Sequence, residues 1–141
     1  MQAAAIQYDL TTLDVPGNPY TVAYGISGNN IAGTTSDADL NQSGFIYDGS
    51  GYTRLTCPLG DATNIYGVSG NSVVGCYMDA SYQSHSVVYN GSNWTTLTGS
   101  DARGISGSNI VGSFSDESGQ HGYLYDGTNY TTLDYATAAV P

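Results

Sequence analysis

Two kinds of side chain in this 141-residue sequence could act together at a binding site: flat aromatic rings and clustered oxygen ligands. The rings recur beside amides in glycine-rich turns, where they could stack on sugar faces while the amides hydrogen-bond sugar hydroxyls. The sequence therefore predicts a glycan-binding site with the candidate residues Tyr52, Trp94, Tyr130, Asn93 and Asn129. The alternative is that the rings pack across strands and only stabilise a sheet.

The oxygen ligands alternate along one segment, as they do in calcium-binding loops. They are Asp37, Asp39, Asn41 and Ser43. Gln42 stands where such a loop usually has a glycine after its third ligand, and the equivalent turns keep only the first aspartate. Calcium is the one cofactor that the sequence admits. The alternative is a solvated hairpin end in which the aspartate stabilises its own turn.

The sequence contains no recognisable catalytic pattern. His85 and His121 occupy the same place in two repeated units, which favours a turn or packing role over catalysis. A nucleophile elbow, a metal-binding cluster of His and Cys, and a phosphate loop are all missing from the sequence. We therefore expect a protein that is not an enzyme. A glycosidase that uses two carboxylates is the less favoured alternative, because β-propellers do host such enzymes.

The charge of the chain restricts its partners. Arg54 and Arg103 are its only cations against 12 Asp and Glu residues, which gives a formal net charge of −10. Such a surface cannot neutralise a phosphate backbone or an anionic bilayer, so we expect neither nucleic acid nor membrane insertion. Each arginine is expected to pair with a carboxylate. Cys57 and Cys76 could form a single disulfide bond.

Composition also indicates where the protein acts. The chain is rich in Gly, Ser, Thr and Asn and contains 13 Tyr, which is typical of a hydroxyl-rich all-β domain outside the cytoplasm. The sequence begins without a recognisable signal peptide, so we expect that a secreted form has its leader removed.

Internal repetition organises the chain. Gly-Ile-Ser-Gly begins at Gly25, returns as Gly-Val-Ser-Gly at Gly67 and begins again at Gly104, with spacings of 42 and 37 residues. Each copy is followed by an apolar pair with a glycine, an acidic turn, an apolar triplet and an Asp-Gly or Asn-Gly turn. An aromatic residue and a leucine then close each unit. The closing leucines are Leu55, Leu97 and Leu133.

Each unit reads as an antiparallel meander of four short strands. In the first unit the strands are predicted near residues 23–27, 30–35, 44–47 and 52–56. Apolar residues point to both faces of these strands, so every sheet must be covered on both sides, as in a radial stack of blades. The predicted fold is all-β, with three β-propeller blades. A β-trefoil or a β-prism is the alternative.

A single repeat domain covers residues 1–141. An extra outer strand and linker take residues 1–22, and the three repeats take residues 23–63, 64–101 and 102–141. The extra strand is predicted because Tyr8–Asp14 copies the outer strand at Tyr130–Asp134. Propellers have about four to eight blades, so we expect self-association, as a dimer that completes a six-bladed ring. The spare strand would complete a blade of the partner, or mark a longer repeat array.

The third unit, Gly104 to Asp134, resembles the repeats of the bacterial "probable extracellular repeat" family. Those repeats read Gly-Ile-Ser-Gly-x-Asn-Ile-Val-Gly, then His-Gly-Phe-Leu-Tyr-Asp-Gly, then Tyr-Thr-Thr-Leu-Asp. The second unit departs from this pattern at Cys76–Met78 and Ser86, and the first departs at Asp37–Ser43. The resemblance implies a propeller-like repeat in an extracellular or cell-surface protein, and it implies no catalytic residues.

These observations together predict a secreted or surface-displayed module that binds or scaffolds without catalysis, with glycans as the expected ligand. The alternative is a purely structural extracellular repeat, whose aromatic residues are all internal.

Overall fold

The computed structural model describes residues 2–135, and strands are its only regular secondary structure. The strands form three four-stranded antiparallel sheets, each ordered as along the chain. The all-β prediction and the three meanders are therefore confirmed. Residues 2–135 contain no helix, and so none that is long and apolar enough to cross a membrane. Residues 1 and 136–141, at the ends of the predicted linker and third repeat, lie outside the described residues.

The strand bounds follow the repeat. The first sheet consists of β1 (Tyr20–Ser27), β2 (Asn30–Ser36), β3 (Gln42–Tyr47) and β4 (Tyr52–Leu55). The second consists of β5 (Asp61–Ser69), β6 (Ser72–Met78), β7 (Ser84–Tyr89) and β8 (Trp94–Thr96). The third consists of β9 (Asp101–Ser106), β10 (Asn109–Asp116), β11 (Gly119–Tyr125) and β12 (Tyr130–Leu133). The β1–β2 ladder extends beyond the predicted apolar residues, because Tyr20 still pairs with Ser36.

Hydrogen-bonded turns join the third and fourth strands of each sheet. The glycines of these turns have φ angles of 94° to 97°, a region that favours glycine; they are Gly49, Gly91 and Gly127. The residue before each glycine accepts hydrogen bonds from the amides two and three residues further on; these acceptors are Asp48, Asn90 and Asp126. Because these bonds form within a few residues, the turns were predictable from the sequence.

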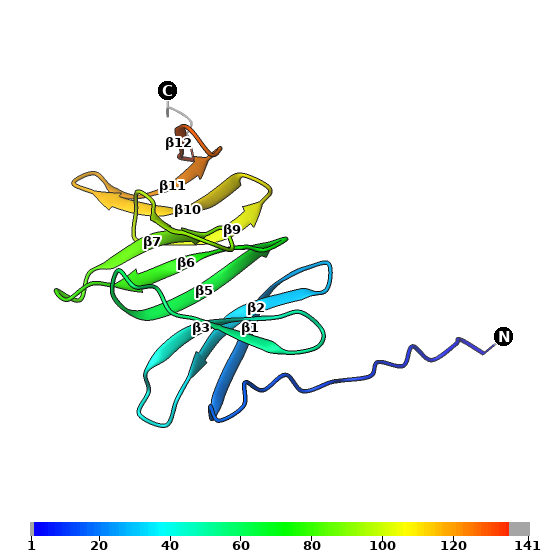
Figure 1. Ribbon diagram of the computed structural model, residues 1–141. Coiled ribbons are helices and arrows are strands. Elements are labelled where there is room, and N and C mark those ends of the chain that lie inside the picture. Colours follow the sequence, from blue (N-terminus) through cyan, green and yellow to red (C-terminus); the bar gives the residue numbers. More distant parts are fainter. Residues whose placement is uncertain (1, 136–141) are drawn as a thin grey trace.

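The three sheets stack in chain order (Figure 1), with the first in blue and cyan, the second in green and the third in yellow and orange. Strand β5 packs against β1, β2 and β3, and β9 packs against β5, β6 and β7. A Cβ atom added at Gly25 would lie 3.3 Å from the Cα of Gly67, and one at Gly67 would lie 3.4 Å from the Cα of Gly104. The recurring glycine is therefore explained by the close approach of successive first strands.

Two hydrophobic clusters fill the seams between neighbouring sheets. The first seam contains Ala32, Leu55, Ile65, Val68 and Val73. The second seam contains Val74, Leu97, Ala102, Ile110 and Tyr123. Four of these pairs occupy equivalent repeat positions: Ala32 and Val74, Leu55 and Leu97, Ile65 and Ala102, and Val73 and Ile110. The middle sheet is thus covered by apolar residues on both faces. The six-stranded barrel of a β-trefoil does not occur among residues 2–135.

The segment before β1 differs from the predicted extra strand. Residues 8–14 form no strand, and Figure 1 shows this part of the chain running away from the sheets. Leu10 is 97% exposed, whereas residues 11–13 line clefts beside the first sheet without joining it as a strand. The chain joins the folded part at the buried Val15, whose amide donates a hydrogen bond of 3.0 Å to the Thr21 hydroxyl.

Candidate functional site

The three candidate aromatic rings pack on tyrosines of the neighbouring strand. The ring centroids lie 4.7 Å apart for Tyr52 and Tyr47, 4.7 Å for Trp94 and Tyr89, and 4.6 Å for Tyr130 and Tyr125. Each pair consists of directly opposed residues on the third and fourth strands. This geometry matches the sheet-stabilising alternative, in which one ring face is covered by a neighbour.

The surroundings of the three rings differ. Trp94 packs against both the first seam and a second cluster around Cys57. The Tyr130 hydroxyl accepts a hydrogen bond of 3.0 Å from the amide of Thr98, at the end of the preceding sheet. Tyr52 lines a cleft together with Tyr47 and Arg54, and burial raises the pKa of its hydroxyl. The rings lie on three different sheets, so each would bind a ligand separately.

The two candidate amides lie in the turns beside these rings. The side chains of Asn93 and Asn129 are exposed, while their backbone amides donate hydrogen bonds of 2.8 and 2.7 Å within the turns. The side chains therefore remain open to solvent next to Trp94 and Tyr130.

The candidate calcium loop is a hydrogen-bonded turn. One oxygen of Asp37 accepts from the amides of Asp39 and Asn41, each at 2.9 Å, and the other accepts from the Asn41 side chain at 2.9 Å. These bonds, first that of the Asn41 side chain, hold the pKa of Asp37 below its ordinary value. Ser43 is buried on β3. Within residues 2–135, no three His, Cys, Asp or Glu side chains are arranged to hold a metal.

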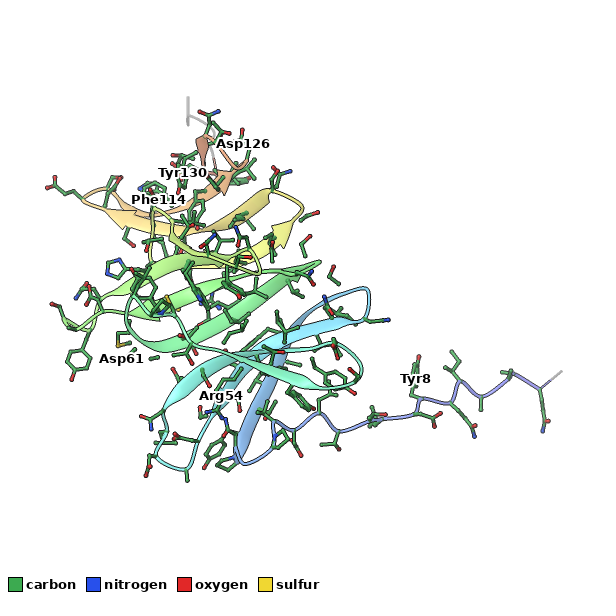
Figure 2. All side chains as sticks on the ribbon, viewed as in Figure 1. Tyr8, Arg54, Asp61, Phe114, Asp126 and Tyr130 are labelled. Atoms are coloured by element: carbon green, nitrogen blue, oxygen red, sulfur yellow. The ribbon has the colours of Figure 1, made fainter. Side chains whose placement is uncertain are left out.

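Residues that depart from the repeat come together at the edge of the first seam. Asp37, residues 40–43 and Arg54 line one cleft of roughly 520 Å³ with the start of β5. We call it the seam cleft; its polar lining includes Asp37, Asn41, Ser43, Arg54, Thr56 and Asp61. Figure 2 shows Arg54 on the first sheet and Asp61 on the second. The sequence did not predict this convergence, because the residues lie on two different sheets.

Arg54 is oriented by a series of hydrogen bonds. It donates a bond of 2.7 Å to the side-chain oxygen of Asn18, and the Asn18 amide donates one of 2.9 Å to the Thr35 hydroxyl. Thr35 is almost fully buried. The expectation that Arg54 pairs with a carboxylate was therefore wrong, because the Asn18 carboxamide lies within reach. The equivalent residues in the other sheets are Thr96 and Thr132, so only the first sheet has a cation here.

The opposite wall of the seam cleft has an unusual backbone. Ala62 has a φ of 51°, in the left-handed region that a residue with a Cβ seldom adopts. The pairing of β5 with β6 shifts register between Asp61 and Asn64, so a bulge begins the strand at the cleft. Bulges and left-handed residues are often found beside functional sites.

His121 belongs to a cluster that the sequence did not reveal. Its Nδ1 lies 2.8 Å from Asp134, and its Nε2 lies 2.9 Å from the Ser118 hydroxyl and 3.2 Å from Asp116. This connectivity resembles a Ser-His-Asp triad. However, the Ser118 hydroxyl donates its proton to Asp116 at 2.6 Å, so it has none to give to the histidine.

Two carboxylates favour the charged form of the His121 ring. The hydrogen bond to Asp134, followed by that to Asp116, raises the pKa of His121. The ring also stacks on Phe114, at 5.1 Å between centroids. His85 makes a similar contact with Asp79 at 2.6 Å. Both histidines therefore stabilise the turn between the second and third strands of their sheets.

The second arginine and the cysteines have structural positions. Arg103 donates a hydrogen bond of 2.7 Å to Asp101, as expected for an arginine in an acidic chain, and its guanidinium lies 4.2 Å from the centre of the Tyr66 ring. Cys57 and Cys76 are buried and unbonded, so the disulfide alternative is not realised. Burial raises the pKa of the Cys57 thiol.

Comparison with protein-family models, curated proteins and solved structures finds no match to this chain. The resemblance to the extracellular repeat family therefore stays a prediction, and the functional argument depends on the residues themselves.

Proposed function

We propose that the chain is a non-catalytic binding and scaffold module that acts outside the cell and binds a glycan in the seam cleft. The observation that carries the proposal is the convergence of non-repeating residues. A side chain that recurs in every unit, as Asp37 does with Asp79 and Asp116, serves the repeat itself. Arg54, Asn41 and Ser43, in contrast, differ from the residues at the equivalent positions of the other units. These residues meet at one cleft, where packing does not require them.

The chemistry of the cleft suits a neutral sugar. The Arg54 guanidinium supplies hydrogen-bond donors, and the carboxylates of Asp37 and Asp61 supply acceptors, which together match vicinal hydroxyl groups. Two carboxylates against one guanidinium disfavour an acidic sugar. The proposal includes no metal, and calcium at Asp37, Asp39, Asn41 and Ser43 stays the alternative, because both carboxylate oxygens of Asp37 already accept hydrogen bonds within the turn.

The scaffold part of the proposal treats each four-stranded sheet as a blade of a propeller-like array. It is supported by the two equivalent seams, which stack the sheets in chain order. The extracellular location is supported by the hydroxyl-rich, acidic composition and by the resemblance of the third unit to extracellular repeats.

A purely structural extracellular repeat is the second candidate function. It is favoured by the position of Trp94, whose ring packs into the first seam and against Tyr89. In that case the aromatic residues serve the packing of the array and bind no sugar.

An array of neutral glycans tests the proposal with two matched variants. Arg54→Thr installs the residue found at the equivalent positions in the other sheets, so the fold should tolerate it. Arg103→Tyr also removes one cation and installs the residue of the equivalent positions Tyr24 and Tyr66. We expect a glycan to bind the native chain and to bind Arg103→Tyr with the same affinity. It should bind Arg54→Thr at least ~10-fold more weakly, which corresponds to the loss of about one hydrogen bond to a charged group.

Other outcomes separate the candidates. Binding that survives Arg54→Thr but is lost in Tyr130→Ala would show that the glycan binds at the aromatic rings beside the hairpin turns and not in the seam cleft. An array on which nothing binds would refute the glycan proposal and support the structural repeat.

A further inference from the structure

The two seams bury the same repeat position in the same way. In the first seam, Ala32 is fully buried against the following sheet, with Leu55 beside it at 6% exposure. In the second seam, Val74 is fully buried and Leu97 is again 6% exposed. Each seam therefore places a small apolar side chain of one sheet into a hollow formed largely by the next.

The third sheet presents the same residues with no further sheet over them among residues 2–135. Val111 is equivalent to Ala32 and Val74, and it is 41% exposed. Leu133 is equivalent to Leu55 and Leu97, and it is 51% exposed. This end of the stack is therefore a seam surface without its partner. We call it the trailing face; it is drawn in yellow and orange in Figure 1.

The first sheet presents the complementary hollow. An apolar groove of roughly 310 Å³ is lined by Leu13, Ala23, Gly25, Ile26 and Ile31, with Tyr24 at its edge. The first five correspond by repeat position to Leu55, Ile65, Gly67, Val68 and Val73. All of these except Gly67 form the first seam together with Ala32. Ile26 is 71% exposed, whereas its equivalent Val68 is 7% exposed. We call this end of the stack the leading face.

We propose that the trailing face of one copy of this chain binds the leading face of a second copy, with Val111 seated in the groove formed by Ala23, Ile26 and Ile31. The inference depends only on the equivalence of the seams, and it is independent of the glycan proposal. A second copy is the occupant that the observations favour, because each end face already carries the residues that its counterpart meets inside the chain.

Polar groups at the seams support the same pairing. The Ser27 hydroxyl accepts a hydrogen bond of 3.0 Å from the amide of Gly70, and the Ser69 hydroxyl accepts one of 2.9 Å from Gly107. The next bond in this series joins the Ser106 hydroxyl to the amide of Gly28 in the second copy. The strands β1 and β12, one on each end face, contain no charged residue.

The outer part of the new seam has two candidate leucines. Leu133 of one copy and Leu13 of the other lie in identical Thr-Thr-Leu-Asp segments, and only one of them can occupy the site. β12 is paired with β11, whereas residues 8–14 form no strand. We therefore assign the site to Leu133, with the segment before Val15 moving aside when the second copy binds.

Head-to-tail contacts of this kind close into a ring or continue into a filament. Two copies of the chain supply six four-stranded sheets, within the four to eight that closed rings of such sheets contain. The expected species is a closed dimer, with a mass twice the 14.7 kDa of one chain.

Analytical ultracentrifugation of face variants tests this assembly. Val111→Asp alters only the trailing face, and Ile26→Asp alters only the leading face; both residues are exposed in the single chain, so neither change should disturb its fold. Each variant is expected to self-associate at least ~100-fold more weakly, because the new carboxylate would be buried without a partner. Tyr82→Asp is the control, because it removes an 83% exposed apolar residue at a hairpin tip away from both faces.

Mixing the two face variants distinguishes head-to-tail binding from other contacts. The mixture retains one intact trailing face and one intact leading face, so a two-chain particle should reappear although each variant alone is monomeric. The proposal is overturned if the native chain sediments as a single chain at several hundred micromolar. It is equally overturned if the face variants keep the native mass, or if the mixture stays monomeric while the native chain is a dimer.

Discussion

Leu97 and Leu133 provide a direct measurement of what a seam contributes to stability. They occupy the same repeat position, directly after the same Thr-Thr dipeptide, but they are 6% and 51% exposed. Replacing leucine by alanine removes the equivalent of three methylenes, each worth about 0.8 kcal/mol when buried. With a cavity left in the second seam, Leu97→Ala should lower the free energy of unfolding by about 3 kcal/mol. Leu133→Ala should lower it by about 1 kcal/mol, because half of the side chain is already in water and no cavity forms.

Urea unfolding, monitored by the fluorescence of Trp94, the only tryptophan, measures both variants. Low micromolar protein keeps the chains separate, so that self-association does not add to the stability at Leu133. The midpoint of Leu97→Ala should fall well below that of Leu133→Ala, with similar slopes for both. Equal costs for the two substitutions would refute the seam architecture. So would a cost for Leu97→Ala below about 1 kcal/mol, since a buried leucine then contributes no more than an exposed one.

Four further predictions concern acid, histidine, tryptophan and metal. The turn around Asp116 lowers the pKa of this carboxyl from 3.8 to about 2, so the stability that the carboxylate provides is present above pH 3.8 and is lost as the pH falls through about 2. In Asp116→Asn, the melting temperature should therefore change less with pH over this range. His121 has a raised pKa, so the stability that its charged ring provides is complete below pH 6.5 and is lost as the pH rises through the raised value. An NMR titration should show a lower pKa for His121 in Asp134→Asn than in the native chain. Trp94→Ala should destabilise the chain by about 3 kcal/mol in urea, and a native-like midpoint would show that the ring is not packed in the first seam. Because amides already occupy the oxygens of Asp37, a chelator should leave the melting temperature unchanged, whereas a decrease would establish the calcium loop.

The sequence determined the local elements of this protein. Gly49 and its counterparts mark tight turns, and the aspartates and asparagines before them close those turns with bonds that span two or three residues. Short apolar runs mark the strands between the turns, so the three meanders follow from nearest neighbours along the chain. The pairing of Tyr52 with Tyr47 was predictable as the cross-strand alternative for the same reason.

The functional residues could be predicted only in part. Arg54 stood out because it departs from the repeat, but its meeting with Asp61 depends on how the second sheet lies against the first. The contact between His121 and Asp134 likewise joins β11 to the residue that follows β12, and the sequence spacing of these residues carried no sign of it. Contacts of this kind depend on strand order and sheet orientation, which local patterns do not specify.

Leu97 and Leu133 show most clearly where prediction from local sequence ends and the tertiary structure decides. The two residues share their repeat position and their preceding residues, so any local rule assigns both to the same environment. Only the tertiary structure separates them, because a following sheet covers Leu97 and none covers Leu133. Burial is a property of what packs over a side chain, and for the last sheet of this stack the chain itself provides no such cover within residues 2–135.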